Sequence, residues 1–114
     1  GDVHHIFPKK YLVKNRYTPK QYNQVANFVY TEQATNIKVG AMAPNEYMAK
    51  VKSEISAGII NVSTIDSETI LSENLINNDI PLALASSDHS EYENFLAERR
   101  KLMARKIKEY YENL

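Results

Sequence analysis

Two of the three histidines in this chain, His4 and His5, are adjacent in a run that reads V-H-H-I-F. The β-branched and aromatic residues of the run predict a strand over 3–7, which Pro8 ends because proline cannot donate a hydrogen bond to a sheet. Neighbouring side chains on a strand point to opposite faces, so the two imidazoles cannot do the same job. One can face a metal ion while the other faces a substrate, although such a pair by itself is more often structural than catalytic.

The first half of the chain is predicted to supply the elements that position this pair. Proline favours the start of a helix, glycine favours its end, and β-branched or aromatic residues favour strands. These signals predict an irregular basic loop over 9–24 with one helical turn after Thr18-Pro19, a second strand over 27–31, a short helix over 32–39 that Gly40 closes, and a helix from Pro44 through Ile55 that Gly58 ends.

The second half is predicted to be helical. Ser63 or Thr64 is suited to cap a helix with Asp66 and Glu68 in its first turn. The apolar positions of this helix are Ile70, Leu71, Leu75 and Ile76. After a break over 77–81, a long helix is expected from Asp88 or Ser90, with one apolar stripe formed by Tyr92, Phe95, Leu96, Leu102, Met103, Ile107 and Tyr110. The expected fold class is helix-dominated α+β, with two short strands followed by three or four helices.

Length and composition restrict the class of protein. A chain of 114 residues has the length of one domain, and its 43% apolar residues are enough for a core. Cysteine is absent, which excludes disulfides, thiolate zinc sites and a cysteine nucleophile. No apolar run approaches the ~20 residues that span a bilayer, and no signal peptide opens the chain. We therefore expect a soluble, cytoplasmic domain without a membrane partner.

Charge is distributed unevenly, although its total is zero. Residues 1–52 hold eight Lys or Arg against three acids, a net charge of +5, whereas residues 53–96 hold eight acids and no base. Residues 97–114 hold six bases and three acids. A polyanion would be attracted to the first segment and repelled by the second. The pattern favours a nucleic acid as partner, but a chance drift of charge along the chain would look the same.

The order and spacing of the polar residues resemble the HNH endonuclease motif and its ββα-metal fold. The matching runs are D-V-H-H-I-F-P at 2–8 and N-F-V-Y-T-E-Q-A-T-N at 27–36, with the Asn-to-Asn spacing found in the HNH domain of RNA-guided CRISPR nucleases. The chain is more broadly similar to the C-terminal HNH domain of GmrSD-type, modification-dependent restriction endonucleases, through H-H-I-F-P, A-N, T-N, P-x-E-Y and F-L-x-x-R-R in that order. The motif covers 2–47, and the looser similarity covers almost the whole chain.

The resemblance implies a role for each motif residue. His5 would be the general base, since a histidine can take a proton near neutral pH. His4 and Asn36 would hold a divalent ion at the scissile phosphate, where it stabilises the charge that grows on the leaving oxygen. Asn27 would brace the loop between the strands and help to orient the base. One imidazole, one amide oxygen and several waters suit Mg²⁺ best, with Mn²⁺ as a substitute.

The sequence departs from the family pattern at one position and offers three candidate phosphate contacts. Many HNH proteins have a third ligand four residues after the last motif position, where this chain has Gly40. Lys38 follows Asn36 closely, and Lys9 and Lys10 follow the histidine strand, so all three are candidates for binding the DNA backbone. A solvated surface lysine is the alternative for each. The cluster from Glu98 to Lys101 is expected to be a charged helix face, and His89 an exposed residue.

The resemblance also implies a domain organisation. Residues 1–114 would form one HNH nuclease domain, with the motif at about 2–47 and a helical part at about 48–114. Because the motif begins next to Gly1, we expect a domain excised from a longer protein. In restriction enzymes of this type, an upstream domain of the same polypeptide hydrolyses nucleotide and selects the DNA. A role in bacterial restriction or phage defence follows.

Three functions are compatible with these observations. The first is a metal-dependent endonuclease that hydrolyses DNA phosphodiester bonds. The second is a catalytically silent module that binds DNA or another partner on the same scaffold, favoured by the basic first segment. The third is a small metal protein that uses the histidine pair and has no nucleic-acid role.

Overall fold

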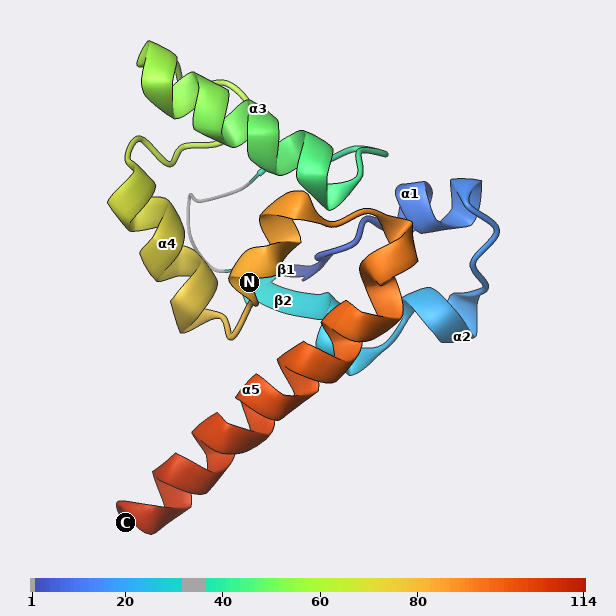
Figure 1. Ribbon diagram of the computed structural model, residues 1–114, viewed down its shortest axis with the longest axis vertical. Helices are drawn as coiled ribbons and strands as arrows, with labels where there is room; N and C mark the ends of the chain where they lie inside the picture. Colours follow the sequence, from blue (N-terminus) through green and yellow to red (C-terminus); the bar gives the residue numbers. More distant parts are fainter. Residues whose placement is uncertain (1, 32–36) are drawn as a thin grey trace.

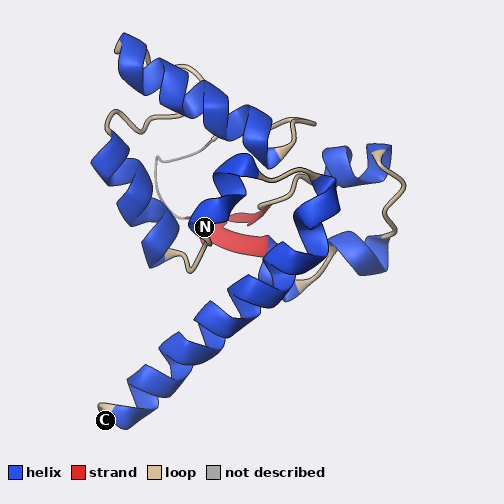
Figure 2. Cartoon of the chain, in the orientation of Figure 1, coloured by secondary structure: helices blue, strands red, loops and turns tan. Residues whose placement is uncertain are grey.

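The structure, a computed structural model, describes residues 2–31 and 37–114, and its only sheet within those ranges has two antiparallel strands (Figures 1 and 2). Strand β1 (Asp2–His5) pairs with β2 (Phe28–Thr31), so that His4 lies opposite Val29 and His5 opposite Phe28. Five α-helices are described around the sheet: α1 (Lys9–Lys14), α2 (Pro19–Tyr22), α3 (Pro44–Ala57), α4 (Glu68–Asn77) and α5 (Tyr92–Glu112). The expected helix-dominated α+β class is confirmed. None of the described helices is long and apolar enough to cross a membrane.

Two short helices lie between the strands, where an irregular loop was expected. The turn after Thr18-Pro19 is confirmed as α2, and the Thr18 backbone N–H donates to the Gln21 side chain at 2.8 Å. The prediction was wrong for 9–14, which form α1. This helix buries Tyr11 and Leu12 in the core, and helices of this length are stabilised by such packing rather than by an apolar repeat. The α1–α2 insertion, residues 9–24, is therefore a folded part of the molecule.

Helix α3 has the bounds that its punctuating residues predict. Pro44 occupies its first position, and Gly58 ends it in the left-handed conformation at φ +70°. One face buries Tyr47, Met48 and Val51 in the core. Of the short helix expected over 32–39, residues 32–36 lie outside the described part of the chain, and 37–39 are not helical.

Helix α4 begins later than its sequence suggested. Its cap is Ser67, whose hydroxyl accepts from the Ile70 N–H at 3.1 Å, rather than Ser63 or Thr64. Ser63 is instead buried, and its hydroxyl accepts from the Ile65 N–H at 3.0 Å within a turn. The helix buries Leu71 and Leu75 but exposes the other two apolar positions, Ile70 and Ile76. The expected break is present at Asn78, the C-cap.

Helix α5 follows the Asp88 cap and a short 3-10 turn at His89–Glu91. Its predicted stripe packs into the core only near the start, at Tyr92, Phe95 and Leu96. The helix then extends away from the rest of the molecule (Figure 1), so that Ile107 is 58% exposed and Tyr110 65% exposed. The apolar repeat thus predicted the helix correctly, but the second half of the apolar stripe is not buried as the repeat suggested.

Two buried tyrosines predict a loss of stability at alkaline pH. The Tyr47 hydroxyl donates to the Ile6 carbonyl at 2.7 Å, and the Tyr92 hydroxyl donates to the Gln21 carbonyl at 2.6 Å. Burial raises the pKa of both groups above the usual 10, in the case of Tyr92 to about 12. The folded chain therefore holds these protons more tightly than the unfolded chain, a stabilisation fully present below pH 10 and lost as pH rises toward 12.

Urea unfolding followed by circular dichroism between pH 8 and 12 would measure this loss. We expect the free energy of unfolding to fall above about pH 10, by about 2–3 kcal/mol for Tyr92 alone. Tyr92→Phe should flatten that part of the profile, whereas replacing the exposed Tyr110 by Phe should not change it. A flat profile for the wild-type protein up to pH 12 would contradict the prediction.

Candidate functional site

The ring of His5 is held by residues of the α1–α2 insertion and of β2. It meets the Tyr22 ring edge-on at 5.9 Å between centroids and the Phe28 ring at 5.0 Å. Its Nε2 atom lies 2.9 Å from Oδ1 of Asn23. The side chain is half-buried, so the imidazole is oriented by three neighbours and still reaches solvent.

The Asn23 contact favours one of the two tautomers of a neutral His5 ring. An amide oxygen only accepts, so Nε2 of a neutral His5 ring is the donor. Nδ1 is then left with its lone pair and can accept a proton from a bound molecule. A neutral ring in this tautomer has the free nitrogen that a histidine base needs.

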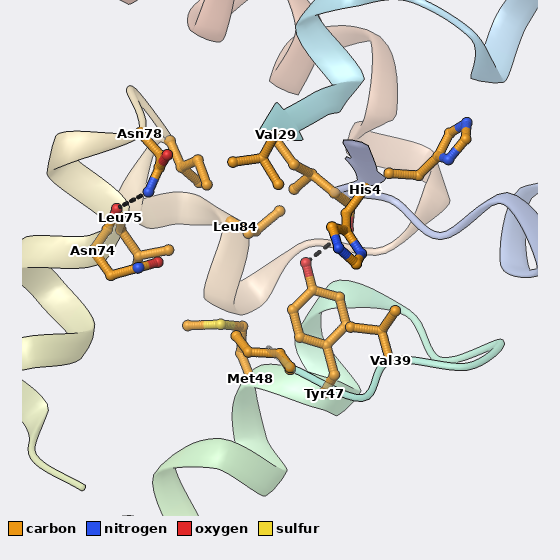
Figure 3. A pocket seen from close by; sticks show the side chains of 13 residues that line it. His4, Val29, Val39, Tyr47, Met48, Asn74, Leu75, Asn78 and Leu84 are labelled. Carbon is orange, nitrogen blue, oxygen red and sulfur yellow. Dashed lines mark hydrogen bonds between the residues drawn. The ribbon is translucent and has the colours of Figure 1, made fainter. Parts of the chain in front are cut away.

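His4 opens on a pocket between the sheet, α3 and α4. Figure 3 shows His4 at one end and Asn74 and Asn78 at the other, with apolar side chains, among them Met48 and Leu84, between them. The imidazole is exposed and has no hydrogen-bond or ion-pair partner within 2–31 and 37–114. Among the described residues, its ring nitrogens are therefore open to an ion from solvent.

The second predicted metal ligand, Asn36, lies outside the described residues. In the part of the chain that is described, no group of three or more His, Asp or Glu side chains lies close enough to hold a metal ion. His4 is thus the single predicted ligand whose position the structure gives. A site built on it would depend on Asn36, water and the substrate for its remaining ligands.

Asn27 is fully buried and joins the chain after β1 to the chain before β2. Its Oδ1 accepts from the Phe7 N–H at 2.8 Å, and its Nδ2 donates to the carbonyls of Phe7 at 3.1 Å and Tyr22 at 3.0 Å. The Ile6 N–H also donates to the Asn27 carbonyl at 2.8 Å. Asn27 therefore braces the loop between the strands, and its effect on a reaction stays a prediction.

The three predicted phosphate contacts differ in their neighbours. The Lys9 ammonium lies 5.6 Å from the centroid of the Tyr22 ring, whose edge also meets His5, so Lys9 and His5 share a neighbour. Lys10 is exposed on α1, and Lys38 is exposed in the loop before α3, where its backbone N–H donates to the Val62 carbonyl. No contact joins Lys38 to either histidine in the described structure.

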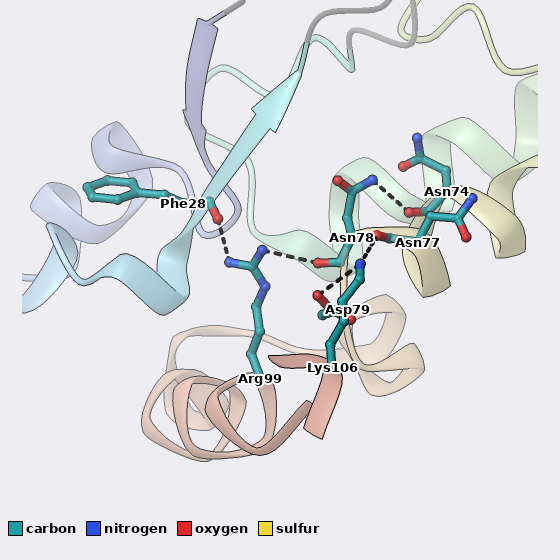
Figure 4. Close-up of polar contacts among 7 residues, drawn as sticks. All are labelled: Phe28, Asn74, Asn77, Asn78, Asp79, Arg99 and Lys106. Atoms are coloured by element: carbon teal, nitrogen blue, oxygen red, sulfur yellow. Dashed lines mark hydrogen bonds and ion pairs between the residues drawn. The ribbon is translucent and has the colours of Figure 1, made fainter. Parts of the chain in front are cut away.

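Arg99 was expected on a charged helix face and is instead buried, with 5% of its surface exposed. Its guanidinium donates to the carbonyls of Ala26 at 3.0 Å, of Asn78 at 3.1 Å and of Phe28 (Figure 4). Burial lowers the pKa of Arg99, against the opposing effect of Asp79. The residue pins the start of β2 and the end of α4 to α5.

A signal in the sequence could have indicated the burial of Arg99. It stands seven residues after Tyr92, on the same stripe as Phe95 and Leu96, so helical geometry places it on the core face. The rest of its cluster is exposed as expected, with Lys101 paired to Glu98 at 3.3 Å. His89 is half-buried rather than exposed, because its ring packs against the rings of Tyr11 and Tyr17.

Asn23 and Tyr22 are the contributors to this site that sequence reasoning missed. Both lie in the segment that was expected to be an irregular loop, and neither matches a motif position. The contact of Tyr22 with His5 spans 17 residues of chain and that of Asn23 spans 18, separations that a local sequence pattern does not register.

No protein-family model, curated protein or solved structure matches this chain.

Proposed function

We propose that this chain is an HNH-type, metal-dependent endonuclease domain that hydrolyses DNA phosphodiester bonds. The observation that carries the proposal is the geometry of His5: its Nε2 is bonded to Asn23 and its Nδ1 is left as an acceptor. The braced loop around Asn27 supports it, as does the antiparallel pairing of the two motif strands. A restriction or phage-defence protein is the context that the motif order favours.

In this mechanism the chain supplies a base and a rigid support. His5 takes a proton from a water molecule while the oxygen of that water attacks phosphorus. Asn27 holds the ends of the strands, one of which carries the base. His4, exposed and unpartnered within the described residues, and Asn36 would hold Mg²⁺ or Mn²⁺. The bound ion would stabilise the negative charge on the leaving 3′ oxygen.

Unpaired cations on the insertion that contacts His5 support a polyanionic substrate. The insertion that holds the ring carries five basic residues, none of them in an ion pair within the described structure: Lys9, Lys10, Lys14, Arg16 and Lys20. Each basic side chain that contacts a phosphate releases counterions, which favours binding at low salt. The acidic stretch 53–96 carries the opposite charge and would repel DNA.

Cleavage of supercoiled plasmid tests the proposal. We expect nicking in Mg²⁺ or Mn²⁺ that EDTA abolishes, because the leaving oxygen needs the ion's charge. His4→Ala and Asn36→Ala should raise the Mg²⁺ concentration needed for half-maximal cleavage, while Asn113→Ala, at the far end of α5, should leave it unchanged. Cleavage that persists in EDTA, or an unchanged Mg²⁺ requirement in both variants, would contradict the metal site.

A silent DNA-binding module is the second candidate, favoured by the same unpaired cations, which need no metal to bind phosphate. Such a module would bind DNA with a steep dependence on salt, equally well with and without Mg²⁺, and would leave plasmid intact. Binding curves in EDTA and in Mg²⁺, measured beside the cleavage assay, separate the two candidates.

A further inference from the structure

We infer that Asn23 is a positioning residue that holds the ring of His5 in one orientation and one tautomer. The inference rests on the proposed function, because a defined base is useful only where a proton is taken. It starts from the single hydrogen bond that the His5 side chain makes in the described structure, between Nε2 and Asn23 Oδ1 at 2.9 Å. Neither residue type nor spacing marked Asn23 in the sequence.

The backbone that presents Asn23 is fixed on both sides. Its own N–H donates to the Pro19 carbonyl at 2.9 Å, which ends α2. The carbonyl of Tyr22, one residue before, accepts from Asn27 Nδ2, and the carbonyl of Gln24, one residue after, accepts from the Asn27 N–H at 2.8 Å. The side chain of Gln24 also accepts from Arg100 on α5 at 3.1 Å. Asn23 is therefore an exposed side chain on an anchored backbone.

The buried Asn27 connects both partners of the His5–Asn23 bond. Its side chain ties Phe7, two residues after His5, to Tyr22, one residue before Asn23. The same amide therefore sets the distance between the strand that carries the base and the turn that carries its acceptor. The middle asparagine of the motif acts on His5 through Asn23, without touching the ring itself.

The aromatic contacts alone do not determine the orientation of the His5 ring. Edge-on packing against Tyr22 and Phe28 restricts the plane of the imidazole, but a half-turn about the Cβ–Cγ bond would exchange the sides on which its two nitrogens lie. The hydrogen bond to Asn23 distinguishes the two states, because only one places a donor against Oδ1. Loss of this contact should misplace the base in a fraction of molecules rather than remove it.

Three variants test the inference. Asn23→Leu removes the acceptor, and Asn23→Asp keeps an acceptor in the same place. Asn15→Leu removes the C-cap asparagine of the neighbouring helix α1 as a matched control. We expect Asn23→Leu to lower kcat for DNA cleavage by about tenfold or more with KM and the melting temperature nearly unchanged, since misplacing a base affects only the chemical step. Asn23→Asp should retain most of the wild-type kcat, and so should Asn15→Leu.

Nitrogen-15 NMR of the His5 ring gives a readout that does not depend on activity. In the wild-type protein and in Asn23→Asp, the neutral ring should carry its hydrogen on Nε2, whereas in Asn23→Leu both tautomers should be populated. Identical ring spectra in the wild-type and Leu proteins, or equal kcat values, would overturn the inference. A wild-type protein that cuts no DNA in either metal would contradict the proposed function, and the ring spectra would then decide the inference by themselves.

Discussion

Replacing His5 by alanine is expected to lower the rate of Mg²⁺-dependent plasmid nicking by about 10²–10⁴-fold, the usual contribution of a positioned general base. The side chain makes one hydrogen bond and two ring contacts at the edge of the sheet and is only half-buried. Its removal should therefore change the free energy of unfolding little. The Mg²⁺ concentration for half-maximal activity should stay the same, because the base is not a ligand in the proposed site.

The other two histidines are the controls for this experiment. His89→Ala removes a half-buried imidazole that packs against Tyr11 and Tyr17, and it should leave the nicking rate unchanged. His4→Ala should raise the Mg²⁺ requirement, so that added metal restores part of its activity but none of that lost in His5→Ala. A His5→Ala protein that nicks plasmid at the wild-type rate would remove His5 from the mechanism and leave the silent DNA-binding module as the better account.

Arg99→Met is expected to lower the free energy of unfolding by about 2–4 kcal/mol, because buried carbonyls lose their donors. The guanidinium donates to the carbonyls of Ala26 and Phe28, on either side of Asn27, and to that of Asn78 at the end of α4 (Figure 4). Methionine fills much of the same volume but donates no hydrogen bond. The total loss should be smaller than the summed cost of leaving each carbonyl without a donor, because the variant no longer has to bury a charge.

Arg100→Met is the matched control, one residue further along α5. Arg100 is exposed, and its side chain bonds only to that of Gln24 in the described structure, so its loss should cost less than about 1 kcal/mol. Urea unfolding followed by circular dichroism measures the free energy of unfolding of both variants. If the slope of this free energy against urea concentration is unchanged, the two variants differ in stability alone. Equal stabilities of the Arg99 and Arg100 variants would mean that water replaces the guanidinium at these carbonyls.

The elements that the sequence determined by itself are those marked by local stereochemistry. Helix α3 begins at Pro44 and ends before Gly58. The first residue of a helix has no hydrogen-bond partner for its backbone N–H, so a proline is tolerated there, and a glycine readily adopts the positive φ that ends a helix. The histidine strand, expected over 3–7 with Pro8 as its end, in fact covers Asp2–His5 and ends three residues before Pro8. The run from Phe28 to Thr31 forms β2 as its β-branched and aromatic residues predict. Each of these choices is made within a few residues of chain.

The candidate site was predictable in part for the same reason. Alternation along a strand separates the side chains of His4 and His5. Both residues line the pocket, but the His5 ring also meets the rings of Tyr22 and Phe28. The bracing position of Asn27 was expected from the motif, and the buried amide makes that contact. Asn36 lies outside the described residues, so its role stays a prediction.

Tertiary structure alone decided the remaining features. Helix α1 forms because Tyr11 and Leu12 find a core to pack against, and α5 leaves that core after Arg99 although its apolar repeat continues. The partners of Arg99 stand 21 to 73 residues away in sequence, and Asn23 stands 18 residues from His5. Burial and hydrogen bonding at such separations depend on how elements pack, whereas helix ends and strand alternation depend on neighbouring residues. For this reason the sequence could suggest His5 as a candidate base, and only the fold could bring Asn23 within hydrogen-bond distance of its ring.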